Sequence, residues 1–222
     1  TLTILNDASA PTISTVTPSG FVRASTQSVM VNATDSETGV ETITYTYNNC
    51  NGGANTTLTL LSNGSVFIGT ANFSALGEGA RACYTVRASN RAGENSSLNG
   101  ELVVDGTPPI VSLLEPTNFA SELANFKFSA SDNLATTLTC SITLNGTVLE
   151  TVTVANGTQT NLTKDLSTFS EGQRLWGATC LDGVGLSTSQ VMPIILDTQS
   201  PMISIGALSI RRTRPTTFTF QS

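Results

Sequence analysis

The residues with the most definite chemistry in this chain of 222 residues are its four cysteines, Cys50, Cys83, Cys140 and Cys180. The first two are 33 residues apart and the last two 40 residues apart. Zinc sites favour cysteines two to four residues apart and often include histidine, which this sequence lacks. Free thiols are a further alternative, but we expect two disulfides. Persistent disulfides indicate an oxidising compartment, and therefore an extracellular location at the cell surface.

Asparagine offers a second kind of chemistry, because Asn-x-Ser/Thr with x other than proline is an acceptor for N-linked glycan. The eight acceptors are Asn32, Asn55, Asn63, Asn72, Asn95, Asn145, Asn156 and Asn161. Asn63, Asn145 and Asn156 each precede glycine, and an Asn-Gly turn explains them without any sugar. Asn32 lies in an alternating apolar run and is expected to point outward from a strand. We expect at least three of the eight to carry glycan.

Four carboxylates, Asp35, Glu37, Asp132 and Asp182, fall near the ends of predicted strands at one pole of each unit. Carboxylates in such loops can bind Ca²⁺ between units. The alternative is that they accept hydrogen bonds from loop amides in Asx turns. Neither unit contains a dense Asp-x-Asp run, so we favour the turns and predict no metal site and no cofactor.

Catalytic residues are harder to find. With no histidine, no cysteine outside the expected disulfides, no G-x-S-x-G elbow and no phosphate-binding glycine loop, the usual pairs of nucleophile and base cannot be assembled. We therefore predict that the chain is not an enzyme and has no small-molecule substrate. Aromatic residues at Trp176, Tyr45 and Tyr47 suggest either a platform for stacking sugars or core packing. For Trp176, which alternates with Cys180, we favour a core position against the disulfide.

The charge balance limits the partners. Lys and Arg number 10 against 16 Asp and Glu, a net charge of −6, and the only basic cluster is Arg211, Arg212 and Arg214, which we interpret as a solvated turn. Nucleic acids and anionic membrane surfaces both attract clustered cations, so neither is an expected partner. No run of 18 apolar residues occurs, so any membrane attachment would lie in parts absent from this sequence.

The elements that position these residues come from a repeat. Asp7-Ala-Ser-Ala-Pro11 recurs as Asp105-Gly-Thr-Pro-Pro109 and Asp197-Thr-Gln-Ser-Pro201, with periods of 98 and then 92 residues. This period suits an autonomous domain. We predict a terminal strand of a preceding module at 1–9, a first module at 10–105, a second at 106–198, and the opening strands of a third at 199–222. The terminal strands indicate either a piece of a longer array, which we favour, or strands donated to a neighbouring subunit.

Within each module, apolar residues alternate with polar ones, as in Val29-x-Val31 and Cys140-Ser-Ile142. This period of two, with β-branched residues and Asn-Gly turns, predicts antiparallel strands. About seven strands in roughly 95 residues are typical of an immunoglobulin-like β-sandwich. Residues 73–77 and 165–169 are each compatible with a short helical turn. The predicted fold class is all-β, with tandem immunoglobulin-like sandwiches.

The second module carries a family resemblance, in Thr107-Pro-Pro-Ile-Val, Phe-Ser-Ala-Ser-Asp132, Leu-Trp176-Gly-Ala-Thr-Cys180-Leu-Asp182-Gly-Val-Gly and Ile-Ile-Leu-Asp197. These segments resemble the Ig-like repeats of archaeal cell-surface proteins, and the resemblance covers essentially the whole chain. It departs at Leu186, where asparagine is usual, and the first module has Asn90 in place of the aspartate. The resemblance implies the fold and a surface location, and no catalytic activity.

In such a fold the strands that carry each pair of cysteines are antiparallel neighbours, so their residue numbers should have a constant sum. Cys140 and Cys180 sum to 320, and transferring Cys50 and Cys83 by the repeat offsets gives 322. We therefore predict the pairs Cys50–Cys83 and Cys140–Cys180. By alternation, the second bridge should face the core and the first should face solvent.

The joints suggest the role. Asp105-Gly-Thr-Pro-Pro109 leaves almost no linker, and its prolines restrict the backbone, so adjacent modules should stack as a stiff rod. We predict a structural component of an extracellular filament or cell-surface layer whose partners are copies of itself or neighbouring surface proteins. The alternatives are the stalk of a cell-surface adhesin and a non-catalytic spacer of a secreted enzyme.

Overall fold

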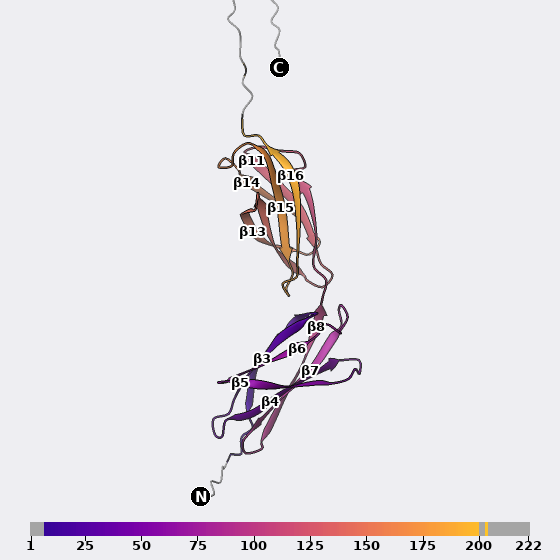
Figure 1. Cartoon of the computed structure of the whole chain (residues 1–222), viewed down its shortest axis with the longest axis vertical. Helices are drawn as coiled ribbons and strands as arrows, with labels where there is room; N and C mark the ends of the chain where they lie inside the picture. The colour runs from indigo at the N-terminus through magenta and orange to yellow at the C-terminus, as the bar shows by residue number, and fades with distance from the viewer. Residues whose placement is uncertain (1–6, 200–202, 204–222) are drawn as a thin grey trace, which may run out of the picture.

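The computed structural model describes residues 7–199 and residue 203, and in this part of the chain it consists of strands and turns. Two β-sandwiches stand end to end (Figure 1). Within the described residues, no helix has the length and apolarity needed to span a bilayer. The strands predicted at the two ends fall mostly on residues 1–6, 200–202 and 204–222, which lie outside the described residues.

The first module has eight strands: β1 (Thr12–Thr17), β2 (Gly20–Arg23), β3 (Thr26–Thr34), β4 (Val40–Asn49), β5 (Thr56–Asn63), β6 (Val66–Asn72), β7 (Arg81–Asn90) and β8 (Asn95–Asp105). Their order is β1-β3-β6-β5-β4-β7-β8-β2. β5 takes part in both layers, since its first five residues pair with β4 and its last three pair with β6. β2 pairs in parallel with β8, whereas β1 pairs with β3.

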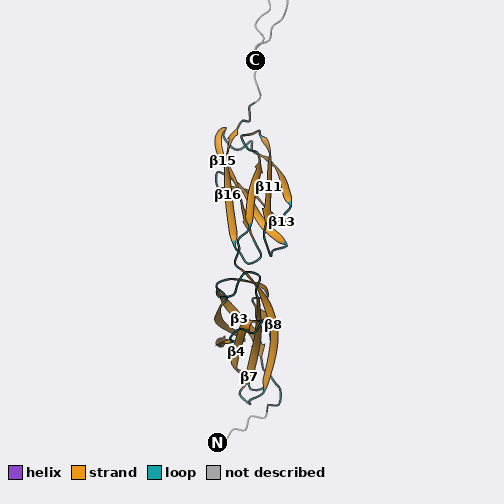
Figure 2. Ribbon diagram, turned by 90° about the vertical axis from the view of Figure 1, so that its right-hand side faces the viewer, coloured by secondary structure: helices purple, strands orange, loops and turns teal. Residues whose placement is uncertain are grey.

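The second module also has eight strands: β9 (Ile110–Glu115), β10 (Phe119–Ala120), β11 (Leu123–Ser131), β12 (Thr137–Leu144), β13 (Thr147–Ala155), β14 (Gln159–Asp165), β15 (Gly172–Leu181) and β16 (Ser187–Leu196). They form two separate sheets, β14-β11-β9 and β10-β16-β15-β12-β13. Figure 2 shows the two modules, built of strands and loops, after a turn of 90°. The all-β, sandwich prediction is therefore correct.

The buried residues fall into two separate clusters, one within residues 22–104 and the other within residues 111–196. Alternation explains them: in β12 the side chains of Leu138, Cys140, Ile142 and Leu144 are all buried, while the intervening residues are not. Each module thus has its own core, and the short segment 106–109 between β8 and β9 joins them.

The turns refine two expectations. At Asn145–Gly146 both residues have positive φ, 49° and 80°, as a type I′ hairpin requires. At the other two Asn-Gly pairs only the glycine, Gly64 or Gly157, has positive φ, so these turns are of a different kind. Residues 73–77 and 165–169, where the sequence is compatible with short helical turns, form isolated turns. Each range has one main-chain hydrogen bond between residues three apart, from Leu76 to Phe73 and from Phe169 to Leu166.

Candidate functional sites: disulfides, glycan acceptors and the joint

The second disulfide lies in the core of its module, near one end of the β12–β15 ladder. Cys140 of β12 and Cys180 of β15 are directly opposite in the antiparallel ladder, with Cα atoms 4.0 Å apart, and both are completely buried. The bond joins two neighbouring strands of one sheet. Its position in the core matches the orientation predicted by alternation along the strands.

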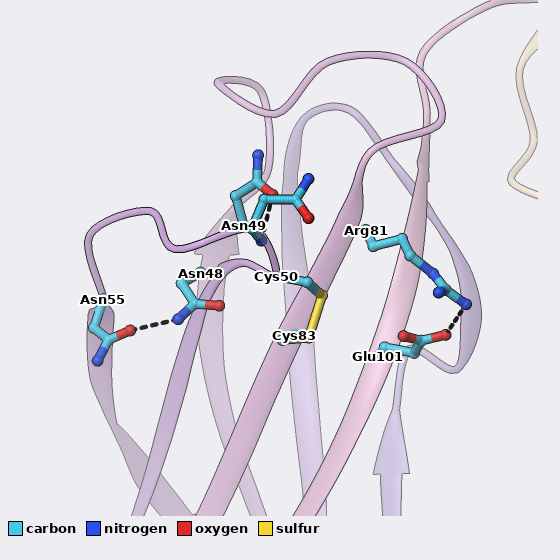
Figure 3. The surroundings of a disulfide bond; sticks show 8 residues. Asn48, Asn49, Cys50, Asn55, Arg81, Cys83 and Glu101 are labelled. Atoms are coloured by element: carbon cyan, nitrogen blue, oxygen red, sulfur yellow. Dashed lines mark hydrogen bonds and ion pairs between the residues drawn. A yellow bond between two sulfur atoms is a disulfide. The ribbon is translucent and has the colours of Figure 1, made fainter.

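The first disulfide lies at a module surface (Figure 3). Asn48 is the residue opposite Cys83 in the ladder, so Cys50 lies two residues past the directly opposed position, just after β4 ends. Both cysteines are partly exposed. Arg81 beside them forms an ion pair of 2.5 Å with Glu101, so the surroundings of this bridge are polar.

A sulfur-based metal site has no support here. Among the described residues, Cys50, Cys83 and Glu101 are the set of cysteine or carboxylate side chains whose ligand atoms lie within 4.8 Å of one another. Both sulfurs are joined in the disulfide, and metals bind cysteine as the thiolate. The bridge is therefore a structural crosslink.

The aromatic residues belong to the cores. Trp176 and Tyr45 are completely buried, and Tyr47 is only 8% exposed. Trp176 tilts against Phe126, with ring centroids 5.2 Å apart, and its indole N–H donates to the carbonyl of Pro116. The predicted core position of Trp176 is correct, and Trp176 belongs to the same buried cluster as Cys140 and Cys180. A sugar-stacking platform at these residues is excluded.

Seven of the eight glycan acceptors are exposed, and Asn32 is partly exposed between β1 and β6. The amide nitrogen Nδ2 is the atom that a glycan modifies. In Asn156 this nitrogen donates to the carbonyls of Asp132 and Ala135. In Asn95 it donates to the carbonyl of Gly93. At these two positions glycan would compete with an existing hydrogen bond.

The four predicted carboxylates do not form one group. Asp35 and Glu37 lie at the outer end of the first module, near Asp7. Asp132 and Asp182 lie at the end of the second module that meets the first. The Oδ1 atoms of Asp35, Asp132 and Asp182 accept hydrogen bonds from amides two to four residues later, as the Asx-turn interpretation predicts.

Three further acidic residues, to which the sequence pattern assigned no chemistry, complete these two groups. Asp7 joins Asp35, while Asp105 and Glu78 of the first module lie near Asp132 and Asp182. Two of them, Asp7 and Asp105, are the first residues of the repeated five-residue segments Asp7–Pro11 and Asp105–Pro109. Their recurrence at the same place in each module was the signal that could have found them.

The electrostatics of the two groups differ. Burial, with the nearby carboxylates of Asp182, Asp132 and Glu78, raises the pKa of Asp105 to about 6. The pKa of its counterpart Asp7 is lowered by hydrogen bonds with Glu37 and Thr38. Asp7 is therefore stabilised as an anion, while a charge on Asp105 is opposed by its surroundings.

The joint also has direct contacts between the modules. The Glu78 carboxylate accepts hydrogen bonds from the amide of Gly106 (2.6 Å) and from the Asn133 side chain (2.7 Å). Arg23 donates to the carbonyl of Gly185 at 3.2 Å. These contacts link the end of the first sandwich to two loops of the second.

No protein-family model matches the chain. No curated protein matches it either. Among solved structures, the fibronectin(III)-like modules of CbhA from Clostridium thermocellum superimpose with a TM-score of 0.53 at 16% identity, covering 85% of this chain and 94% of that one. The FN1–FN3 domains of chicken CNTN1 give 0.54 at 13% identity, covering 83% and 66%. These likenesses show the fold: tandem sandwiches of the fibronectin type III and immunoglobulin kind.

Proposed function

We propose that this chain is a structural segment of an extracellular filament or cell-surface layer. The observation that carries the proposal is the end-to-end stack of two sandwiches across a joint of four residues, 106–109. Contacts of Glu78 and Arg23 across that joint oppose bending. The repeated five-residue segment from Asp to Pro occurs before the first module, between the two modules and after the second. Stacking of the same kind can therefore continue in both directions.

The cysteines and asparagines support an extracellular location. Each module has one disulfide, and such crosslinks persist in oxidising environments. We propose N-linked glycan at acceptors whose Nδ2 atom donates no hydrogen bond within the described part of the chain, Asn55, Asn63 and Asn161 among them. Glycan on exposed strands would protect them from proteases and from pairing with other strands.

The partners we propose are copies of this chain or neighbouring surface proteins. Leu175, Val191 and Ile195 share the outward face of the five-stranded sheet and are 46–67% exposed. Phe119, 68% exposed, lies beside Ile195 at the edge of that sheet. An apolar patch of this kind is typical of an interaction surface.

Cryo-electron microscopy of the native material tests the proposal. We expect the segment to repeat along a continuous fibre or lattice, with density for sugar on some of the acceptor asparagines. If the modules are found only as isolated rods that carry a separate recognition domain, the filament is excluded and the rod is an adhesin stalk. If the rods connect to a catalytic domain, the chain is a spacer of a secreted enzyme.

A further inference from the structure

Asn90 and Asp182 occupy the same position in the two modules: Asn90 is the last residue of β7, and Asp182 directly follows β15. In each, the side-chain Oδ1 accepts hydrogen bonds from the amides two and four residues later. These bonds fix the orientation of both side chains, because turning the Asn90 amide over would break two of them. The other terminal atom, Nδ2 of Asn90 or Oδ2 of Asp182, therefore points to the same place in each module.

In the first module that atom is a donor among acceptors. Nδ2 of Asn90 donates to Oδ2 of Asp7 at 2.8 Å, to the carbonyl of Ser9 at 2.9 Å and to Oδ2 of Asp35 at 3.2 Å. Thr38 adds a hydroxyl donor to Asp7. The group is thus a set of oxygen atoms arranged around one amide NH₂ group. Asn90 is only 1% exposed, so these bonds are sheltered from water.

In the second module the donor is replaced by a third acceptor. Asp105 and Asp132 stand where Asp7 and Asp35 stand in the first module, and Asp182 replaces Asn90. Asp105 is 2% exposed and Asp182 is 8% exposed. Within the described structure, the Oδ2 atoms of Asp132 and Asp182 are buried and have no hydrogen-bond partner. Leaving buried carboxylate oxygens without a partner costs free energy, and a cation removes that cost.

We propose that Asp105, Asp132 and Asp182 bind one Ca²⁺ ion at the joint between the modules. The free Oδ2 atoms of Asp132 and Asp182 and the Asp105 carboxylate are the side-chain ligands. The carbonyl of Thr107, which corresponds to that of Ser9, is a further oxygen. Ligands that are all oxygen favour a hard cation, and Ca²⁺ tolerates irregular sites that Mg²⁺ does not.

The arrangement without the ion is open. The three aspartates are not a set whose ligand atoms all lie within 4.8 Å of one another among the described residues. Binding of one ion by all three carboxylates therefore requires them to move closer together. Arg23 is the cation near this loop, but it donates to the carbonyl of Gly185 and forms no ion pair within the described residues.

The position of the site gives it a mechanical consequence. Asp105 is the last residue of β8 in the first module, whereas Asp132 and Asp182 belong to loops of the second. An ion held by all three ties the last strand of one sandwich to the pole of the next. The joint would then be stiffer with Ca²⁺ than without it, whatever assembly the array builds.

Isothermal titration calorimetry of the whole chain, stripped with a chelator and titrated with CaCl₂, tests the site. We expect one Ca²⁺ per chain, with a Kd of about 10⁻⁴–10⁻³ M, as in other extracellular modules. Asp182→Asn recreates the first module's arrangement and should abolish binding. Asn90→Asp makes the converse change and should raise the stoichiometry from one to two. Titration with MgCl₂ should give at least tenfold weaker binding.

The control variant is Asp165→Asn, which alters an exposed aspartate of the second module that bonds only to the local Ser167. It should bind Ca²⁺ like the unchanged chain. Absence of Ca²⁺ binding by the folded, unchanged chain would overturn the proposal. Undiminished binding in Asp182→Asn would overturn it too. Circular dichroism of each variant establishes that it is folded.

Discussion

Asn90 and Asp182 each accept hydrogen bonds at Oδ1 from the amides two and four residues later, yet Nδ2 of Asn90 donates three hydrogen bonds while Oδ2 of Asp182 has no partner within the described structure. The two modules therefore differ in this one atom. In the first module the atom has hydrogen-bond partners, whereas in the second module it has none within the described structure. The difference has a consequence for stability that is independent of any assembly.

In the presence of a chelator, Asp182→Asn should raise the free energy of unfolding of the second module by about 1–2 kcal/mol. The reason is that the amide NH₂ group of asparagine, a donor, replaces an unpartnered buried oxygen. Thermal unfolding in EGTA measures this. Asp165→Asn is the control and should have little effect. A lower melting temperature for Asp182→Asn would show that its Oδ2 atom is satisfied in a way that we have not identified.

Calcium should also slow hydrogen exchange at the joint. The amides of Gly106 and Thr107 donate to Glu78 and Asp105, so their protection reports how often the joint opens. We expect slower exchange at both amides with CaCl₂ in the unchanged chain and no slowing in Asp182→Asn. Equal slowing in the two proteins would show that the effect of Ca²⁺ on the joint does not depend on the three aspartates.

The two disulfides should differ in their accessibility to reductant. Cys50 and Cys83 are partly exposed, while Cys140 and Cys180 are 0% exposed. Because exchange requires a thiolate to reach a sulfur atom, a mild reductant should open Cys50–Cys83 first under native conditions. Alkylation followed by mass spectrometry detects the order. Simultaneous loss of both bridges would mean that reduction follows global unfolding.

Loss of Cys140–Cys180 should then be the more damaging change. The bridge spans 40 residues, and closing such a loop stabilises a fold by about 3–4 kcal/mol in the chain-entropy model. Replacing both cysteines by alanine also leaves a space in the core. Urea unfolding of the double variant should show a large decrease in the free energy of unfolding of the second module only. An equal decrease in the first module would indicate coupling across the joint.

Gly177→Ala should destabilise the second module by about 1–3 kcal/mol, as overpacking does in a core. A Cβ atom on Gly177 would lie 2.5 Å from the main-chain oxygen of Gln190 in the neighbouring strand, which cannot move without disturbing the sheet. Gly183→Ala is the matched control, because nothing lies within 4 Å of the position that its methyl group would take. Thermal unfolding of the two variants should therefore differ.

Occupancy of the glycan acceptors should follow the hydrogen bonding of Nδ2. Asn161 on the edge strand β14 is exposed and should carry glycan in the native protein. Asn156 should be unmodified, because its Nδ2 atom holds the Asp132 loop through two hydrogen bonds. Mass spectrometry of glycopeptides gives the occupancy at each position. Full modification at Asn156 would show that the sugar is attached before this loop folds.

Much of the fold could be predicted from the sequence because its signals are local. Alternation along a strand decides which side chains are buried, so the inward direction of Cys140 and Cys180 follows from their neighbours. The partner of each cysteine follows from antiparallel register once the strands are assigned. The two-residue difference in the sums for Cys50 and Cys83 is real, because Asn48, and not Cys50, lies directly opposite Cys83. The sequence does not predict the irregular pairing between Val40 and Thr42 at the other end of this ladder, because such an irregularity is not visible in a pattern of period two.

The sequence by itself determined the all-β class, the repeat and the residues able to crosslink or accept glycan, because these depend on residue type and on short-range spacing. Only the tertiary structure decided that Asp105 of the first module lies near Asp132 and Asp182 of the second. Asp105, Asp132 and Asp182 are far apart along the chain, and they become neighbours because the end of β8 and two loops of the second module converge at the joint. Whether an oxygen has a partner depends on its neighbours in space, so the unpartnered atoms at the joint became visible only in the folded chain.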